Sequence, residues 1–158
     1  MILLYLASDG ICAIIRAMIA RIVVDTSVFT AALIGHEGPN REILRRCLLG
    51  QYQPLLGNAL FSEYEAVSMR KAVLDRCPVP KQDVLDLLEA FCSVCEWVPI
   101  YYLWRPNLPD EADNCLLELA VAGNAQWIVT NNVRDFRNAE LNFPGIRIIT
   151  PEEILTGE

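Results

Sequence analysis

The feature of this sequence that most constrains its fold is the apolar run at residues 22–24, which ends abruptly in the carboxylate of Asp25. Consecutive large apolar residues without polar alternation are typical of a strand covered on both faces, as in a parallel sheet with helices on each side. In such sheets the site lies at the carboxyl ends of the strands. Asp25 is therefore a candidate functional residue, although an aspartate here can also cap the helix expected to begin near Ser27.

Strands and helices alternate along the rest of the chain. The further expected strands are residues 53–56, 97–100, 126–130 and 145–149, and the expected helices are residues 28–33, 40–49, 59–72, 81–95, 110–122 and 151–155. This alternation predicts an α/β fold, specifically a three-layer α/β/α sandwich with a mostly parallel central sheet.

The length of 158 residues, of which 53% are hydrophobic, suits a single domain, expected at residues 21–158. Residues 1–20 are interpreted as an N-terminal extension. The extension is either a short extra helix or, as we favour, a segment upstream of a natural start at Met18, since Met18 leads directly into the first strand. A membrane span is not expected, because Asp9 and Arg16 interrupt the apolar N-terminus. The first segment also lacks the basic start of a secretory signal.

The six cysteines lie mostly on apolar helical faces, which favours buried, reduced thiols in a cytoplasmic protein over a disulfide framework. Cys92 and Cys95 form a C-x-x-C pair, which can be half of a zinc site. No second pair exists, and His36 is the sole histidine. Zinc is therefore not expected.

The formal net charge of −7 argues against broad electrostatic capture of nucleic acid, although it leaves room for a nuclease with an acidic metal cluster. Two arginine groups are candidates for local phosphate binding. One consists of Arg41, Arg45 and Arg46, and the other of Arg134 and Arg137. The alternative for each group is a solvated surface.

Two acidic residues interrupt apolar helical stripes. The neighbours of Glu63 at helical spacing are Ala59, Leu60, Ala66 and Val67. A carboxylate on such a stripe is costly unless it binds a cation or forms a salt bridge, here with Arg70. Asp113 repeats the pattern, with Leu116, Leu117 and Ala120 on its stripe. It can also form an approximate capping box with Asp110, and both roles can coexist.

The expected strand that ends at Thr130 is a second buried strand followed by polar residues. Its tip should lie beside that of the first strand, so that Thr130 and Asp135 join Asp25 as candidates. The ordinary alternative is a turn, which Asn and Asp favour.

An aromatic segment precedes the third acidic motif. Tyr101, Tyr102, Trp104 and Arg105 can stack on the bases of a single strand, form an interface, or anchor a loop to the core.

Taken in order, these motifs resemble those of PIN-domain ribonucleases, specifically toxins of type II toxin–antitoxin pairs related to the virulence-associated protein C toxins. The resemblance runs from about residue 21 to residue 155. It rests on residues 24–27, Glu63, residues 113–120 and residues 129–136. By resemblance, residues 21–158 form a PIN-like nuclease domain, and Asp25, Glu63 and Asp113 take the first three acidic positions and hold the metal.

The fourth position departs from the commonest family pattern. Many members carry an aspartate two residues after the strand-end threonine, where this chain has Asn132, whereas others place an acid three residues later, as Asp135 stands here. Ser27 stands where asparagine is common. We expect Asp135 to act through water, and Thr130, Ser27 and Asn132 to support the cluster. Arg134 and Arg137 are expected to bind substrate.

The resemblance implies a metal-dependent endoribonuclease that leaves a 5′-phosphate and a 3′-hydroxyl. Mg²⁺ and Mn²⁺ prefer oxygen ligands. Two carboxylates about 4 Å apart repel by roughly 4 kcal/mol at an effective dielectric near 20, so converging acids need a cation. Mg²⁺ or Mn²⁺ is therefore the expected cofactor. The resemblance also implies an RNA substrate, a cognate antitoxin protein, a homodimer and a cytoplasmic location.

Two other functions remain open at this point. The first is a PIN-fold module with weak or no activity that binds RNA or a protein partner, which Asn132 would permit. The second is a phosphatase of the haloacid dehalogenase type, which also begins with an aspartate at a strand tip. That chemistry requires a second aspartate two residues after the first, where this chain has Ser27.

Overall fold

The computed structural model of the chain describes residues 19–103, 108, 111–136 and 143–157. Most of the expected N-terminal extension, residues 1–20, therefore lies outside the described residues. So do Trp104, Arg105, Asp110 and Arg137.

The centre of the fold is a five-stranded sheet with the order β3-β2-β1-β4-β5. Its strands are β1 (Ala20–Val24), β2 (Tyr52–Leu56), β3 (Glu96–Trp97), β4 (Trp127–Val129) and β5 (Arg147–Ile149). All the pairs between neighbouring strands are parallel. Because β1 lies between β2 and β4, its apolar residues 22–24 are buried, as the unalternating run predicts.

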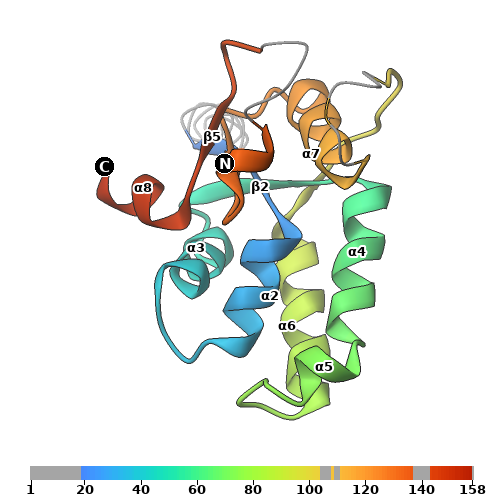
Figure 1. Cartoon of the computed structure of the whole chain (residues 1–158), viewed down its shortest axis with the longest axis vertical. Helices are drawn as coiled ribbons and strands as arrows, with labels where there is room; N and C mark the ends of the chain where they lie inside the picture. The colour runs from blue at the N-terminus through green and yellow to red at the C-terminus, as the bar shows by residue number, and fades with distance from the viewer. Residues whose placement is uncertain (1–18, 104–107, 109–110, 137–142, 158) are drawn as a thin grey trace, which may run out of the picture.

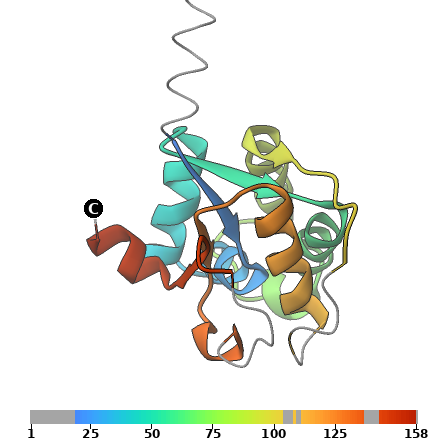
Figure 2. The same ribbon diagram turned by 90° about the horizontal axis from the view of Figure 1, so that it is seen from above.

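The described helices cover both faces of this sheet. They are α2 (Thr26–Ile34), α3 (Pro39–Leu48), α4 (Asn58–Ser68), α5 (Lys71–Leu74), α6 (Lys81–Val94), α7 (Glu111–Ala122), the 3-10 helix η1 (Val133–Phe136) and α8 (Pro151–Thr156). Figure 1 shows α2, α3, α4 and α6 packed together below the sheet and α7 above it. Figure 2, seen from above, shows α7 on the near side of the sheet, where it contacts β1, β2 and β4. The predicted three-layer α/β/α sandwich is confirmed.

The helix expected at residues 59–72 is wrong in one respect, because two helices occupy this stretch. Helix α4 ends at Ser68, and Arg70 adopts extended backbone angles of φ −72° and ψ 121° before α5 begins. The Arg70 carbonyl then accepts hydrogen bonds from the first N–H groups of α5, at Val73 and Leu74. The break turns the chain and leaves the Arg70 side chain exposed.

Of the described cysteines, Cys47 is buried and the others are partly buried, and all are free thiols. Burial raises the pKa of Cys47 to about 12 and also raises the pKa values of Cys77, Cys92 and Cys95. Reactive thiol chemistry requires the thiolate, which these shifts disfavour at neutral pH. Within the described residues, no helix is both long enough and apolar enough to cross a membrane.

The end of α7 is held tightly against the sheet. Arg21 on β1 donates through Nε to the Gly123 carbonyl at 2.7 Å, and its Nη2 pairs with Glu96 on β3 at 2.7 Å. A Cβ atom on Gly123 would lie 2.4 Å from Leu55 Cδ1 and 3.1 Å from the backbone oxygen of Leu119. Only glycine therefore allows α7 to end this close to β2.

Replacing Gly123 with Ala should lower the free energy of unfolding by about 1–3 kcal/mol, the usual cost of overpacking. The matched control is Gly145→Ala, because a Cβ there meets no atom of the described residues within 4 Å. Its effect should stay within about 0.5 kcal/mol. Chemical unfolding of both variants measures the difference, and equal stabilities would contradict the packing argument.

Candidate active site

The candidate site begins where β1 and β4 end side by side. The register pairs Val24 with Val129, so the next residues, Asp25 and Thr130, are also neighbours. The Asp25 N–H donates to the Val129 carbonyl at 2.9 Å, and the Thr130 N–H donates to the Ile149 carbonyl on β5 at 3.0 Å. Asp25 is 8% exposed and Thr130 is fully buried. The parallel sheet thus brings these two polar side chains to one edge.

Two hydroxyl groups hold the Asp25 carboxylate. Thr130 Oγ1 donates to Asp25 Oδ2 at 2.6 Å, and Ser27 Oγ donates to the same oxygen at 2.5 Å. The backbone N–H of Asn131 donates to Ser27 Oγ at 3.2 Å, and that of Asn132 donates to Thr130 Oγ1 at 3.0 Å. A backbone N–H can only donate, so each hydroxyl accepts there and its single proton is left for Asp25. The direction of both hydrogen bonds to the carboxylate is therefore fixed.

This arrangement excludes the helix-capping alternative for Asp25. The residue occupies the position before α2, but its side chain makes no capping hydrogen bond. Both of its side-chain hydrogen bonds end on Oδ2, and no described residue donates to Oδ1. Oδ1 thus remains available to a cation or to water.

Glu63 lies beside the first residue of α2. Helices α2 and α4 pack against each other, and Thr26 Oγ1 donates to Glu63 Oε2 at 2.7 Å. Glu63 is half-buried and forms no ion pair with Arg70, both of which the structure describes. The salt-bridge alternative is therefore wrong, and the carboxylate instead faces the start of α2.

Asp113 is half-buried in the first half of α7. This helix contacts β1, β2 and β4 and also packs on α4, the helix that carries Glu63. Among the residues that the structure describes, no three His, Cys, Asp or Glu side chains are grouped so that they could hold one metal ion. The structure therefore joins Asp25 and Glu63 through adjacent residues of α2, and the ligand role of Asp113 stays a prediction.

The remaining predicted residues follow β4. Asn132, Arg134 and Asp135 are exposed, and the Asp135 N–H donates to the Asn132 carbonyl at 3.0 Å at the start of η1. The described residues give the side chains of Arg134 and Asp135 no ion pair. Arg137, the other predicted substrate-binding residue, lies outside the described part of the chain.

The aromatic segment before α7 does not anchor a loop to the core at the positions that the structure describes. Tyr101 is 82% exposed and Tyr102 is 78% exposed. This leaves the stacking and interface roles open for these two side chains.

The sequence analysis missed Tyr64, which supports the site from below. Its hydroxyl donates to the carbonyl of Val24, the last residue of β1, and its ring stacks on Phe29 with centroids 4.4 Å apart. Burial raises the pKa of Tyr64 well above its usual range, so the phenol keeps its proton. The available signal was position, because Tyr64 follows Glu63 directly.

Two buried polar residues on α7 were also missed. Asn114 is 4% exposed and exchanges two hydrogen bonds with the backbone of Leu108, at 2.9 and 3.1 Å. Glu118 is 2% exposed, although it is an acid. The two residues are four positions apart and so share one helical face, which was a usable signal.

The chemistry of the site fits a hard divalent cation. The side chains gathered at the start of α2 offer oxygen atoms alone, from Asp25, Glu63 and three hydroxyl groups. Mg²⁺ and Mn²⁺ favour such donors. The arrangement lacks the nitrogen and sulfur ligands that zinc sites use.

Comparisons with known proteins agree with this fold. The sequence pattern of the PIN domain matches residues 21–134 of this chain, well over half of its length. In its fold the chain is similar to a chain in the crystal structure of VapBC2 from Rickettsia felis bound to a DNA fragment from their promoter. The TM-score is 0.56 at 17% sequence identity, and the match covers 82% of this chain and 98% of that one. No curated protein matches the sequence. The chain therefore belongs to the PIN-domain family.

Proposed function

We propose that this protein is a divalent-metal-dependent endoribonuclease and the toxin of a type II toxin–antitoxin pair. The observation that carries the proposal is the Asp25 carboxylate, held by Ser27 and Thr130 at the carboxyl ends of the central strands. Membership of the PIN-domain family supports nuclease chemistry. The fold similarity to a chain of the VapBC2 structure supports the toxin assignment.

In this proposal Asp25, Glu63 and Asp113 hold Mg²⁺ or Mn²⁺, and Asp135 assists through water. The cation, when bound, favours the hydroxide form of a water and offsets charge that builds up on the phosphate oxygens. Ser27 and Thr130 fix the Asp25 carboxylate in one orientation, and Thr26 does the same for Glu63. Arg134 and Arg137 would bind the RNA near its cleaved bond.

The partners follow from the same assignment. We expect a cognate antitoxin protein that covers the site, a homodimer of this chain and a cytoplasmic location. Tyr101 and Tyr102 are exposed and suit either RNA bases or such a protein.

The alternative is a PIN-fold module that binds RNA or a protein without cutting. Two observations favour it. No group of three metal-binding side chains occurs among the described residues, and Asn132 stands exposed where many family members have an acid.

Asp25→Asn and Glu63→Gln should each abolish metal-dependent cleavage of single-stranded RNA, because each removes a charged ligand. The matched control is Glu65→Gln, an exposed acid two residues from Glu63. It should cleave at the wild-type rate. Gel analysis of labelled RNA with Mn²⁺, and with EDTA as a blank, measures the effect. Full activity of Asp25→Asn would refute the assignment.

Manganese titration separates the nuclease from the module. Bound metal should stabilise the fold by about 2.7 kcal/mol at a hundredfold excess over its Kd, and RNA cleavage should rise over the same concentrations. Stabilisation without cleavage would favour the module. An unchanged melting temperature together with no cleavage would show that the protein binds no Mn²⁺. A metal site would then be excluded for the nuclease and for the binding module alike.

Thr130→Val should lower metal affinity or activity by roughly 10–100-fold, the usual effect of losing a group that orients a ligand. Thr130→Ser keeps the hydroxyl and should restore most of the loss. The apparent metal affinity, measured from the melting temperature at increasing Mn²⁺, reports the change. Equal affinities for the Val and Ser variants would show that the hydroxyl has no positioning role.

A further inference from the structure

A groove leads away from the candidate site along α2. It has a volume of about 520 Å³, and it begins at Thr26 and Ser27, beside the Asp25 carboxylate. It continues past Thr30 and apolar residues of α2 and α4 to Arg70 and Arg76, which flank α5. Figure 1 shows α2 running from the sheet down toward α5, which it contacts. The groove therefore joins the site to the lower end of the molecule.

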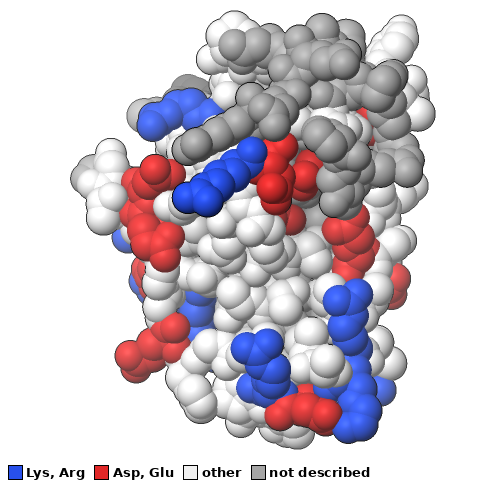
Figure 3. Space-filling model, in the orientation of Figure 1, with Lys and Arg blue, Asp and Glu red and all other residues white. Residues whose placement is uncertain are grey.

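The charge of the groove is opposite to that of the chain. Its lining contains two arginines and no acidic residue, whereas the whole chain has a net charge of −7. The described residues give Arg70 and Arg76 no ion pair, while the neighbouring Lys71 pairs with Asp75 at 2.7 Å. In Figure 3 basic side chains lie at the lower end of this face, over α5, with an acidic side chain between them. Both guanidinium groups are thus available to an anion.

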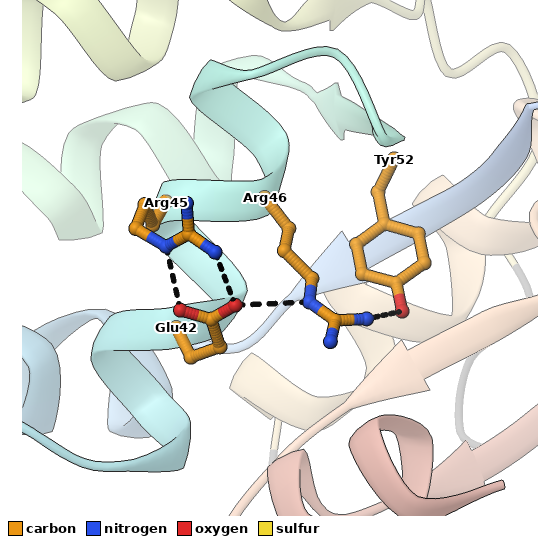
Figure 4. Close-up of polar contacts among 4 residues, drawn as sticks. All are labelled: Glu42, Arg45, Arg46 and Tyr52. Atoms are coloured by element: carbon orange, nitrogen blue, oxygen red, sulfur yellow. Dashed lines mark hydrogen bonds and ion pairs between the residues drawn. The ribbon is translucent and has the colours of Figure 1, made fainter. Parts of the chain in front are cut away.

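Arg45 and Arg46 of α3, in contrast, form ion pairs within the protein, and Arg41 of the same helix donates to the Gly35 carbonyl at 2.8 Å. Figure 4 shows Glu42 between Arg45 and Arg46, with a two-point contact to Arg45 at 2.6 and 2.7 Å and a contact to Arg46 at 3.0 Å. These hydrogen bonds lower the pKa of Glu42 to about 2, so the acid stays charged at neutral pH. The adjoining cavity of about 400 Å³ also contains Glu37. This surface is therefore less suited to a phosphate chain than the groove along α2.

We propose that the groove along α2 holds the sugar–phosphate backbone of single-stranded RNA beyond the cleaved bond, with Arg70 and Arg76 each contacting a phosphate. This inference rests on the proposed function and names the path of its substrate. Guanidinium groups bind phosphate oxygens through paired hydrogen bonds, and the hydroxyl of Thr30 adds a donor along the path. A nine-residue helix such as α2 spans about 13 Å, which is longer than the distance between two successive phosphates of a strand.

The test measures binding of a fluorescein-labelled single-stranded RNA of mixed sequence as the salt concentration rises. EDTA is present, so that binding is read without cleavage. The double variant Arg70→Gln/Arg76→Gln is compared with Lys71→Gln/Lys81→Gln, which removes two exposed positive charges outside the groove lining. For single strands the slope of log affinity against log salt is about −0.7 per phosphate contact. The slope of the arginine variant, which lacks two such contacts, should therefore be less negative by about 1.4.

The inference requires that the lysine variant keep the wild-type slope. It also requires that the arginine variant bind unrelated RNA sequences more weakly by the same factor, as the loss of backbone contacts predicts. An unchanged slope in the arginine variant would overturn it, and so would equal losses in both variants. A groove that serves a protein partner would also leave the slope unchanged. Arginine-dependent binding without Mn²⁺-dependent cleavage would retain this inference and reject the nuclease. Mn²⁺-dependent cleavage by the wild-type protein, together with an unchanged slope in the arginine variant, would retain the nuclease and reject this inference.

Discussion

The hydrogen bond from Thr130 to Asp25 joins residues 105 positions apart in the chain, and the candidate site depends on it. It forms because β1 and β4 are parallel neighbours whose last residues are in register. A shift of one residue would turn either side chain to the opposite face of the sheet. The apolar burial that aligns these strands therefore also aligns the catalytic candidates, and the packing of the core sets the precision of the site.

Support for Asp25 comes from three directions. The hydroxyl groups of Ser27 on α2 and of Thr130, the residue after β4, hold its carboxylate, and backbone N–H groups of the loop that follows fix the direction of those hydroxyls. The buried Tyr64 holds the carbonyl of the preceding residue, Val24. Each hydroxyl in this set both accepts and donates a hydrogen bond, which favours a rigid arrangement of the buried network.

Elements of the fold could be predicted from the sequence where one physical signal dominates. Unalternating apolar runs revealed the buried parallel strands β1 and β4, whereas the stripe around Glu63 is only partly buried, since Ala59 and Ala66 are exposed. The break at Arg70 could not be predicted, because no glycine or proline marks it and the packing of α5 on α2 and α4 decides it. Tyr64 was missed for a related reason, since a tyrosine on a helix looks like ordinary core until its hydroxyl is seen to meet a strand carbonyl. The groove combines α2 with the segments around α5, a proximity that only the tertiary structure reveals.

The two hydroxyls on Asp25 have one more consequence. Both donate to Oδ2 and so occupy both lone pairs of that oxygen, which leaves Asp25 with a single oxygen to give. Under the proposed function, Asp25 is then a monodentate ligand. Calcium is usually coordinated by six to eight oxygens, often from bidentate carboxylates. The smaller magnesium ion is usually coordinated by one or two carboxylates and by water. The serine and threonine beside this aspartate thus leave it one oxygen for a cation, a number that suits magnesium.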